Sequence, residues 1–247
     1  MAGAGRRLIP WLAAALVVLA ATPVAGLWLY DRGAAGPAQP DPHKHPVRGI
    51  DVSHHNGAID WKRVHAASIG FAYLKASEGG DLRDAAFGAN ARGAARVGLP
   101  AGAYHYFTLC RPGDEQAKNF LAATATARLR LRPAIDLEFS GNCAQRPSRK
   151  AFNHELAVFI NALRKGGARE PIFYVTPEFH AAYLAGGPFQ RRTYWVRDFV
   201  GRLNKPAHSR VMLWQFSARG RVDGVAGPVD LNAFMGTETA FRAGLAP

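Results

Sequence analysis

The stretch PAIDLE, residues Pro133 to Glu138, is a short apolar run that ends on two carboxylates. In a β-strand, side chains at positions i and i+2 lie on the same face, with Cα atoms about 6 to 7 Å apart. If this run is a strand, Asp136 and Glu138 therefore point to the same side. Two like charges at such a short distance raise the pKa of one of the carboxyl groups. That group is then a candidate general acid. A solvated loop start and a salt-bridge site are the alternatives.

Apolar runs of the same kind, bounded by Gly and Pro, recur from Val47 onward. They predict strands at residues 48–52, 70–76, 101–107, 133–137, 171–175, 193–196 and 211–216. Amphipathic stretches predict helices at residues 61–67, 84–97, 114–127, 147–165 and 177–185. Strands that alternate with helices predict an α/β fold, an irregular (β/α) TIM-like barrel. The connections in the last third are shorter, so we expect an incomplete helical layer there.

In such barrels the chemistry lies at the C-terminal ends of the strands, and carboxylates close several of the predicted strands. Asp51 ends the first run and Glu78 the second, although Asp51 is also a candidate cap and Glu78 a candidate first-turn acid. Asp230, in the segment GPVDLN, is a candidate site residue or a turn residue. We predict no metal site, because four histidines lie in a linker and a loop without a third acidic ligand: His43, His45, His54 and His55.

The composition narrows the class of partner. The chain has 247 residues, and 31 basic against 18 acidic side chains give a net charge of +13. Residues 47–247 keep 27 basic and 16 acidic side chains, a net charge of +11. A basic surface implies an anionic partner. We expect an acidic cell-surface polymer and no nucleic acid, because no recognition helix or zinc finger accompanies the charge.

The N-terminal region predicts export. Residues 8–30 carry no charged side chain and are long enough to cross a bilayer, and Arg6 and Arg7 precede them. We favour an uncleaved membrane anchor over a cleaved signal peptide, with the rest of the chain periplasmic or extracellular, or secreted if cleavage occurs. Residues 31–46 are rich in Pro, Ala and Gly and predict a linker. Residues 47–247 would then form a single catalytic domain.

The two cysteines, Cys110 and Cys143, follow the third and fourth predicted strands. Both therefore lie on loops at the same mouth of the predicted barrel. Because an exported domain meets an oxidising compartment, we expect them to form a disulfide bond rather than two free thiols.

Six motifs occur in the order and spacing of a known family. They are GIDVSHHNGAIDW (49–61), FAYLKASEG (71–79), GAYHYF (102–107), AIDLE (134–138), LWQFS (213–217) and VDLNAF (229–234). With them, the chain from Val47 to about Phe241 resembles the glycoside hydrolase family 25 lysozymes. The resemblance implies an N-acetylmuramidase that cleaves the β-1,4 bond between N-acetylmuramic acid and N-acetylglucosamine in peptidoglycan. It requires no cofactor, and we expect a monomer.

The resemblance also assigns roles to residues. The acidic quartet of the family falls on Asp51, Asp136, Glu138 and Asp230. We expect Glu138 to be the general acid, Asp136 to stabilise charge or orient the N-acetyl group of the substrate, and the other two to hold hydrogen bonds. Two alternatives stay open. One is a catalytically silent peptidoglycan-binding module on the same barrel, and the other is a chitinase-like hydrolase.

Candidate substrate-binding residues lie in the same motifs. They are Gln215 and the aromatic residues at strand ends, for which core packing is the alternative: Tyr104, Tyr106, Tyr174, Trp195 and Trp214. The chain departs from the family pattern in three places. The family motif Trp-x-Ala-x-Tyr is WVRDF here, which adds a charge at Arg197 and loses a hydroxyl at Phe199, and Asn56 stands where Gln is frequent.

Overall fold

The computed structural model describes residues 39–199, 203 and 210–244. The predicted anchor, residues 1–30, and most of the predicted linker lie outside the described residues. No helix in the described part is long and apolar enough to cross a membrane. The compact unit begins at Pro40, seven residues before the predicted domain start at Val47. Pro40 is buried, and its carbonyl oxygen accepts a hydrogen bond of 2.6 Å from Arg48 Nη2.

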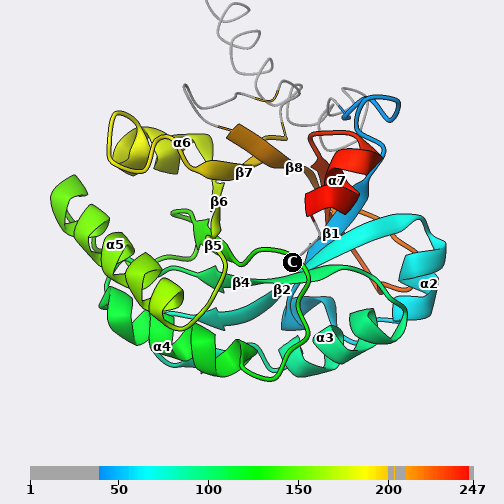
Figure 1. Ribbon diagram of the computed structural model, residues 1–247, viewed down its shortest axis with the longest axis horizontal. Helices are drawn as coiled ribbons and strands as arrows, with labels where there is room; N and C mark the ends of the chain where they lie inside the picture. The colour runs from blue at the N-terminus through cyan, green and yellow to red at the C-terminus, as the bar shows by residue number, and fades with distance from the viewer. Residues whose placement is uncertain (1–38, 200–202, 204–209, 245–247) are drawn as a thin grey trace, which may run out of the picture. The chain divides into compact units, whose positions relative to one another are not determined.

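Nine strands of the described chain form one sheet, and eight of them close a barrel (Figure 1). Around the barrel, the order is β1 (Arg48–Val52), β9 (Val229–Phe234), β8 (Arg210–Gly220), β7 (Thr193–Arg197), β6 (Ile172–Val175), β5 (Ala134–Leu137), β4 (Ala101–Tyr106) and β2 (Ile69–Glu78). Strand β2 pairs with β1 and closes the ring, while the short β3 (Leu82–Arg83) pairs with β2 alone. The predicted irregular (β/α) barrel is confirmed.

One strand of the barrel runs in reverse. Strand β9 is antiparallel to both of its neighbours, β8 and β1, whereas the other barrel pairs are parallel. Its segment, VDLNAF, was predicted as a motif but not as a strand. Because of the reversal, the first residues of β9 lie at the same barrel end as the last residues of β1. Asp230 is therefore a strand residue opposite Asp51 and not a turn residue.

Helices lie outside the sheet along part of its circumference, and the last of them lies over one end of the barrel (Figure 1). They are α2 (Trp61–Ala66), α3 (Phe87–Arg96), α4 (Gly113–Thr124), α5 (Arg149–Lys165), α6 (Pro177–Phe179) and α7 (Glu238–Gly244). The prediction of one helix over residues 177–185 was only partly right, because α6 continues as a π-helical turn, η2 (His180–Leu184). Helix α7 was not predicted. Within the described residues no helix lies between β8 and β9, as the short connections in the last third had indicated.

The helix sequences explain their positions. Helix α5 begins after Ser148, whose side chain accepts a hydrogen bond from the Ala151 amide at 3.2 Å. Its apolar residues recur at helical spacing and pack against the sheet: Phe152, Leu156, Phe159, Ile160 and Leu163.

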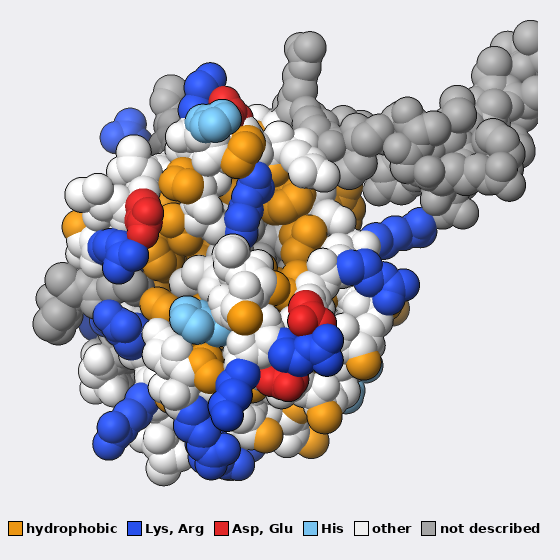
Figure 2. Space-filling view, turned by 90° about the vertical axis from the view of Figure 1, so that its right-hand side faces the viewer, with side chains coloured by type: hydrophobic (Ala, Val, Ile, Leu, Met, Phe, Trp, Pro, Cys, Tyr) orange, Lys and Arg blue, Asp and Glu red, His pale blue; other side chains and the backbone are white. Residues whose placement is uncertain are grey.

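The surface of the protein is basic. On the face drawn in Figure 2, Lys and Arg side chains outnumber acidic ones.

A second apolar cluster fills the barrel interior. Phe71, Tyr73, Trp195 and Leu213 belong to it. Phe241 of α7 packs on Phe71 with a ring-centroid distance of 5.6 Å. Helix α7 therefore covers the barrel end where β1 and β2 begin. Carboxyl and amide side chains gather at the opposite end, where the parallel strands finish.

Two loops at that opposite end are joined. Cys110 and Cys143 form a disulfide bond with a Cα–Cα distance of 6.1 Å, which confirms the expected pairing. Beside the bond, the Asn142 side chain donates to the carbonyl oxygens of Phe107 and Glu138 at 2.9 and 3.0 Å. These hydrogen bonds connect the end of β4 to the residue that follows β5.

Candidate active site

A cavity of about 270 Å³ opens where the parallel strands of the barrel end. It is lined by Asp51, Tyr104, Asp136, Glu138, Tyr174, Trp195, Arg197, Phe199, Gln215, Ala218 and Asp230. The structure thus brings together all four members of the predicted acidic quartet. Asp51 and Asp136 are the last residues but one of β1 and β5, Glu138 directly follows β5, and Asp230 is the second residue of the reversed strand β9.

Asp51 lies at the centre of a buried hydrogen-bond network. Its Oδ2 accepts from Gln215 Nε2 at 2.9 Å and from Asn232 Nδ2 at 2.7 Å. Each amide is itself oriented by an aromatic donor. Trp195 Nε1 donates to Asn232 Oδ1 at 2.7 Å, and the Tyr174 hydroxyl donates to Gln215 Oε1 at 2.9 Å. Both amides therefore present their N–H groups to Asp51, which favours its ionised form.

Asp51 and Asp230 are hydrogen-bonded to each other, and this bond affects the pKa of both carboxyl groups. Burial raises the pKa of both carboxyl groups, but three side-chain hydrogen bonds to Asp51, one of them from Asp230, oppose this effect. For Asp230, burial and the charge of Asp51 together raise the pKa to about 8. At neutral pH, Asp230 is therefore the protonated partner and donates its hydrogen bond to Asp51.

Asp136 has one carboxyl oxygen with no hydrogen-bond partner among the described residues. Its Oδ1 is buried and accepts no hydrogen bond from the described part of the chain. Burial raises the pKa of Asp136 well above its ordinary value, and the charges of Glu138 and Asp51 raise it further. A buried polar atom that lacks a partner is costly unless another group supplies one. Its place in the cavity wall makes a ligand the candidate partner.

Glu138 lies nearer to the opening, with 13% of its side chain exposed. Burial raises its pKa, whereas Arg197, whose Nη1 lies 2.7 Å from Glu138 Oε2, lowers it. Arg197 also approaches Glu178 at 3.6 Å. Sequence reasoning noted Arg197 as a departure from the family pattern but did not place it in the site. The ion pair between Arg197 and Glu138 connects β7 to the residue after β5 across the cavity mouth. It depends on the closed barrel and is not evident from the sequence.

Three of the predicted aromatic residues line the cavity: Tyr104, Tyr174 and Trp195. Trp195 is 1% exposed and Tyr174 is 5% exposed, so they offer almost no ring face to a ligand. In the described structure they orient the Asp51 network, and Trp195 also packs in the barrel core. A sugar-stacking role for Tyr104 stays a prediction.

The structure does not bring Tyr106 and Trp214 to this cavity. The Tyr106 hydroxyl donates to the Ser140 carbonyl oxygen at 2.6 Å, beside the mouth. Trp214 Nε1 donates to the Asp198 carbonyl oxygen at 2.8 Å. Gln215, the next residue on β8, faces the barrel interior, so strand alternation directs Trp214 to the outer face. The prediction that Trp214 stacks on a sugar at this site is not supported by its position.

The four histidines that we did not expect to bind a metal, His43, His45, His54 and His55, do not line the cavity. His54 Nδ1 lies 2.7 Å from Asp84 Oδ2, and the His54 ring packs on His55. In the described chain no group of three or more His, Cys, Asp and Glu side chains is arranged to hold a metal ion. Asn56, the other departure from the family pattern, donates to the Pro228 carbonyl oxygen at 3.3 Å.

Comparisons with known proteins agree with this geometry. The model of the family described as glycosyl hydrolases family 25 matches residues 50–225. The Escherichia coli K12 protein YegX is 32% identical over 207 residues, which cover 82% of this chain and 74% of YegX. Lysozyme M1 of Streptomyces globisporus is 31% identical over 210 residues, covering 80% of this chain and 70% of that protein. The solved structure of a family 25 glycosyl hydrolase from Bacillus anthracis has a TM-score of 0.74 at 30% identity, covering 84% of this chain and 96% of its own. This chain is a member of glycosyl hydrolase family 25.

Proposed function

We propose that this chain is a lysozyme that hydrolyses the β-1,4 bond between N-acetylmuramic acid and N-acetylglucosamine in peptidoglycan. The observation that carries the proposal is the cavity in which four carboxyl groups have different environments. Burial raises the pKa of all four, but at Asp51 three side-chain hydrogen bonds oppose the rise, whereas at Asp136 and Asp230 the charge of a neighbouring carboxylate adds to it. Glycoside hydrolysis needs a protonated acid beside the leaving oxygen and negative charge beside the oxocarbenium-like centre.

The positions of the carboxyl groups suggest their roles. Glu138 is the partly exposed member of the pair at the end of β5, so the leaving oxygen of a glycan can approach it from the opening. Asp136 lies deeper, where its free Oδ1 can orient the N-acetyl group of the sugar or stabilise positive charge at the anomeric carbon. Asp51 and Asp230 form the anionic side of the cavity, and the amides of Gln215 and Asn232 donate hydrogen bonds to Asp51.

The alternative of a catalytically silent wall-binding module fits these environments less well. A binding module gains nothing from burying several carboxyl groups that repel one another, since each buried charge costs free energy unless it is paired. In this cavity the charges of Asp51 and Glu138 raise the pKa of Asp136. An acid–base mechanism uses that arrangement.

The location outside the cytoplasm is part of the same proposal. The substrate is a cell-wall polymer, and the disulfide bond between Cys110 and Cys143 is of the kind that persists in oxidising compartments. We propose that residues 8–30 anchor the chain in the membrane and that the barrel acts as a monomer on the outside. The mass of the mature protein tests the anchor, because cleavage near Ala25 would remove it.

The experiment on function compares two glutamate variants in a wall-turbidity assay. Glu138→Gln should keep the fold and lower turnover by about 10² to 10⁴, the usual contribution of general acid catalysis. Glu178→Gln is the matched control, because Glu178 also approaches Arg197 but is more exposed and does not line the cavity. The control should retain activity within a few-fold. Near-normal turnover by a folded Glu138→Gln variant would rule out the assignment of the acid.

A further inference from the structure

The barrel end opposite the cavity carries a cluster of arginines, here called the basic face. Its members are Arg130, Arg132, Arg164, Arg169, Arg192 and Arg210. Arg132 and Arg169 lie two and three residues before β5 and β6, Arg192 directly precedes β7, and Arg210 is the first residue of β8. Because these strands are parallel, their first residues meet at one end of the barrel.

Contacts between neighbouring segments hold the basic face together. Arg132 Nε donates to the Glu170 carbonyl oxygen at 2.6 Å. The Glu170 carboxylate pairs with Arg192 and lies 3.8 Å from Arg164. Arg169 Nη1 donates to the Arg130 carbonyl oxygen at 3.1 Å. The Glu170 carboxylate therefore pairs with two of the six guanidinium groups.

The clustered positive charges lower the pKa of an arginine within the basic face. The pKa of Arg132 is lowered by burial and by the charges of Arg169, Arg210 and Arg192. A helix C-terminus attracts basic side chains, but this accounts only for Arg164, which lies in the last turn of α5. The other members lie in loops or at strand starts. A cluster of like charges at these positions attracts an anionic surface.

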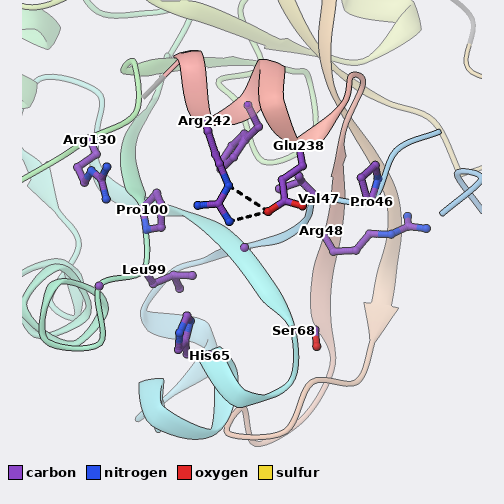
Figure 3. Close-up of a pocket in the computed structure, with 13 residues that line it drawn as sticks. Pro46, Val47, Arg48, His65, Ser68, Leu99, Pro100, Arg130, Glu238 and Arg242 are labelled. Atoms are coloured by element: carbon purple, nitrogen blue, oxygen red, sulfur yellow. Dashed lines mark hydrogen bonds and ion pairs between the residues drawn. The ribbon is translucent and has the colours of Figure 1, made fainter. Parts of the chain in front are cut away.

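The basic face continues into a cavity of about 450 Å³ under helix α7 (Figure 3). Arg130 lines it on one side, and the ion pair between Arg242 and Glu238, with a distance of 2.6 Å, lines it on another. Arg48, the first residue of β1, is also part of its wall, and Pro46 precedes it. The chain thus enters the barrel at the same end as the basic face.

We propose that the basic face docks on a bilayer surface that contains anionic phospholipid headgroups. Nine residues, 31–39, separate the apolar residues 8–30 from Pro40, and this connection spans at most about 35 Å. If the apolar segment spans the membrane, as proposed above, the entry end of the barrel stays within that distance of the lipid headgroups. The basic face then meets them, since anionic bilayers attract basic clusters near their surface.

Docking at this end orients the enzyme. Glu138 lies six positions after Arg132, with β5 between them, which places the basic face roughly 20 Å from the catalytic cavity by strand rise. With the basic face on the membrane, the cavity opens away from the bilayer and toward the wall. An anionic wall polymer is the competing partner, and the experiment below separates the two.

The test measures co-sedimentation of a fragment of residues 39–247 with lipid vesicles. This fragment contains the compact unit with its closed barrel and its core, and it lacks the apolar segment. It should bind vesicles of phosphatidylcholine with phosphatidylglycerol, and bind vesicles of phosphatidylcholine alone far more weakly. Binding should weaken as salt rises, because exposed charges are screened beyond about 8 Å at physiological ionic strength. Equal binding to both kinds of vesicle would overturn the proposal.

Two triple variants with the same loss of charge locate the surface. Arg130→Gln, Arg169→Gln and Arg210→Gln together should weaken binding about 100-fold, since each basic residue near an anionic bilayer contributes roughly fivefold. The control variant removes three exposed basic side chains elsewhere, at Arg92, Arg111 and Lys118, and should bind nearly as well as the parent fragment. Equal weakening of both variants would mean that net charge alone acts, which refutes a docking face.

The same variants separate this proposal from the proposed function. Hydrolysis of purified walls should be unchanged in the basic-face variant, which also shows that it is folded. If the basic-face variant binds vesicles normally but no longer binds purified walls, then the basic face binds a wall polymer and the proposal is wrong. Failure of the parent fragment to hydrolyse walls would refute the function and leave the vesicle result standing.

Discussion

Removal of the disulfide bond should lower the stability of the barrel without disarranging its catalytic cavity. The bond joins Cys110 and Cys143, which are 33 residues apart. In the chain-entropy model, the unfolded chain loses about 2.1 + 1.5R ln 33 cal/mol/K, or about 12.5 cal/mol/K, which corresponds to about 3.7 kcal/mol at 25 °C. Replacing both cysteines with alanine should therefore lower the free energy of unfolding by about 3 to 4 kcal/mol.

The cavity should survive because hydrogen bonds hold the same loops. Asn142 donates to Phe107 and Glu138 and accepts from the Leu109 amide at 2.9 Å. Urea unfolding at 25 °C measures the stability, and wall turbidity below the transition measures the activity, which should stay within about twofold of the parent protein. A loss of less than about 1 kcal/mol, or inactivity of a fully folded variant, would refute this reasoning.

Three further predictions concern individual side chains. Arg197→Gln should raise the pKa of Glu138, because the nearby cation stabilises the carboxylate; the alkaline limb of the kcat/KM profile should then move to higher pH, and an unmoved limb would contradict the pairing. Asp230 holds its proton to a pKa of about 8 in the folded state, against an ordinary value of 3.8, so its contribution to stability falls as pH rises from about 4 to about 8. Urea unfolding of Asp230→Asn should show a smaller loss across that range, and an unchanged slope would count against the raised pKa. Trp214→Phe should leave KM unchanged and cost about 1 kcal/mol of stability, the hydrogen bond to Asp198 being lost; a large rise in KM would restore its stacking role.

Local patterns in the sequence were sufficient for the features that depend on a single strand. The alternation of Asp136 and Glu138 predicted that both carboxyl groups share a side, and both line the cavity. The alternation of strands and helices predicted the barrel. These features follow from the two-residue period of a strand and the 3.6-residue period of a helix, which can be seen without knowledge of the neighbouring elements.

Features that depend on barrel closure were not predictable from local patterns. A short apolar run such as VDLNAF does not reveal its direction, so the reversal of β9 and the pairing of Asp230 with Asp51 appear only in the structure. The contact of Arg197 with Glu138 joins residues 59 positions apart. Asn232 was missed as a site residue for the same reason, because its partners come from β1 and β7.

The central claim is tested most directly by the chemical identity of the new reducing ends in digested peptidoglycan. Purified walls are treated with the full-length protein, the products are reduced with borohydride, and the reduced sugars are identified by mass spectrometry. A muramidase with Glu138 as its acid yields N-acetylmuramitol ends, and the Glu138→Gln variant yields almost none. N-acetylglucosaminitol ends, or no new reducing ends from the folded parent protein, would contradict the account.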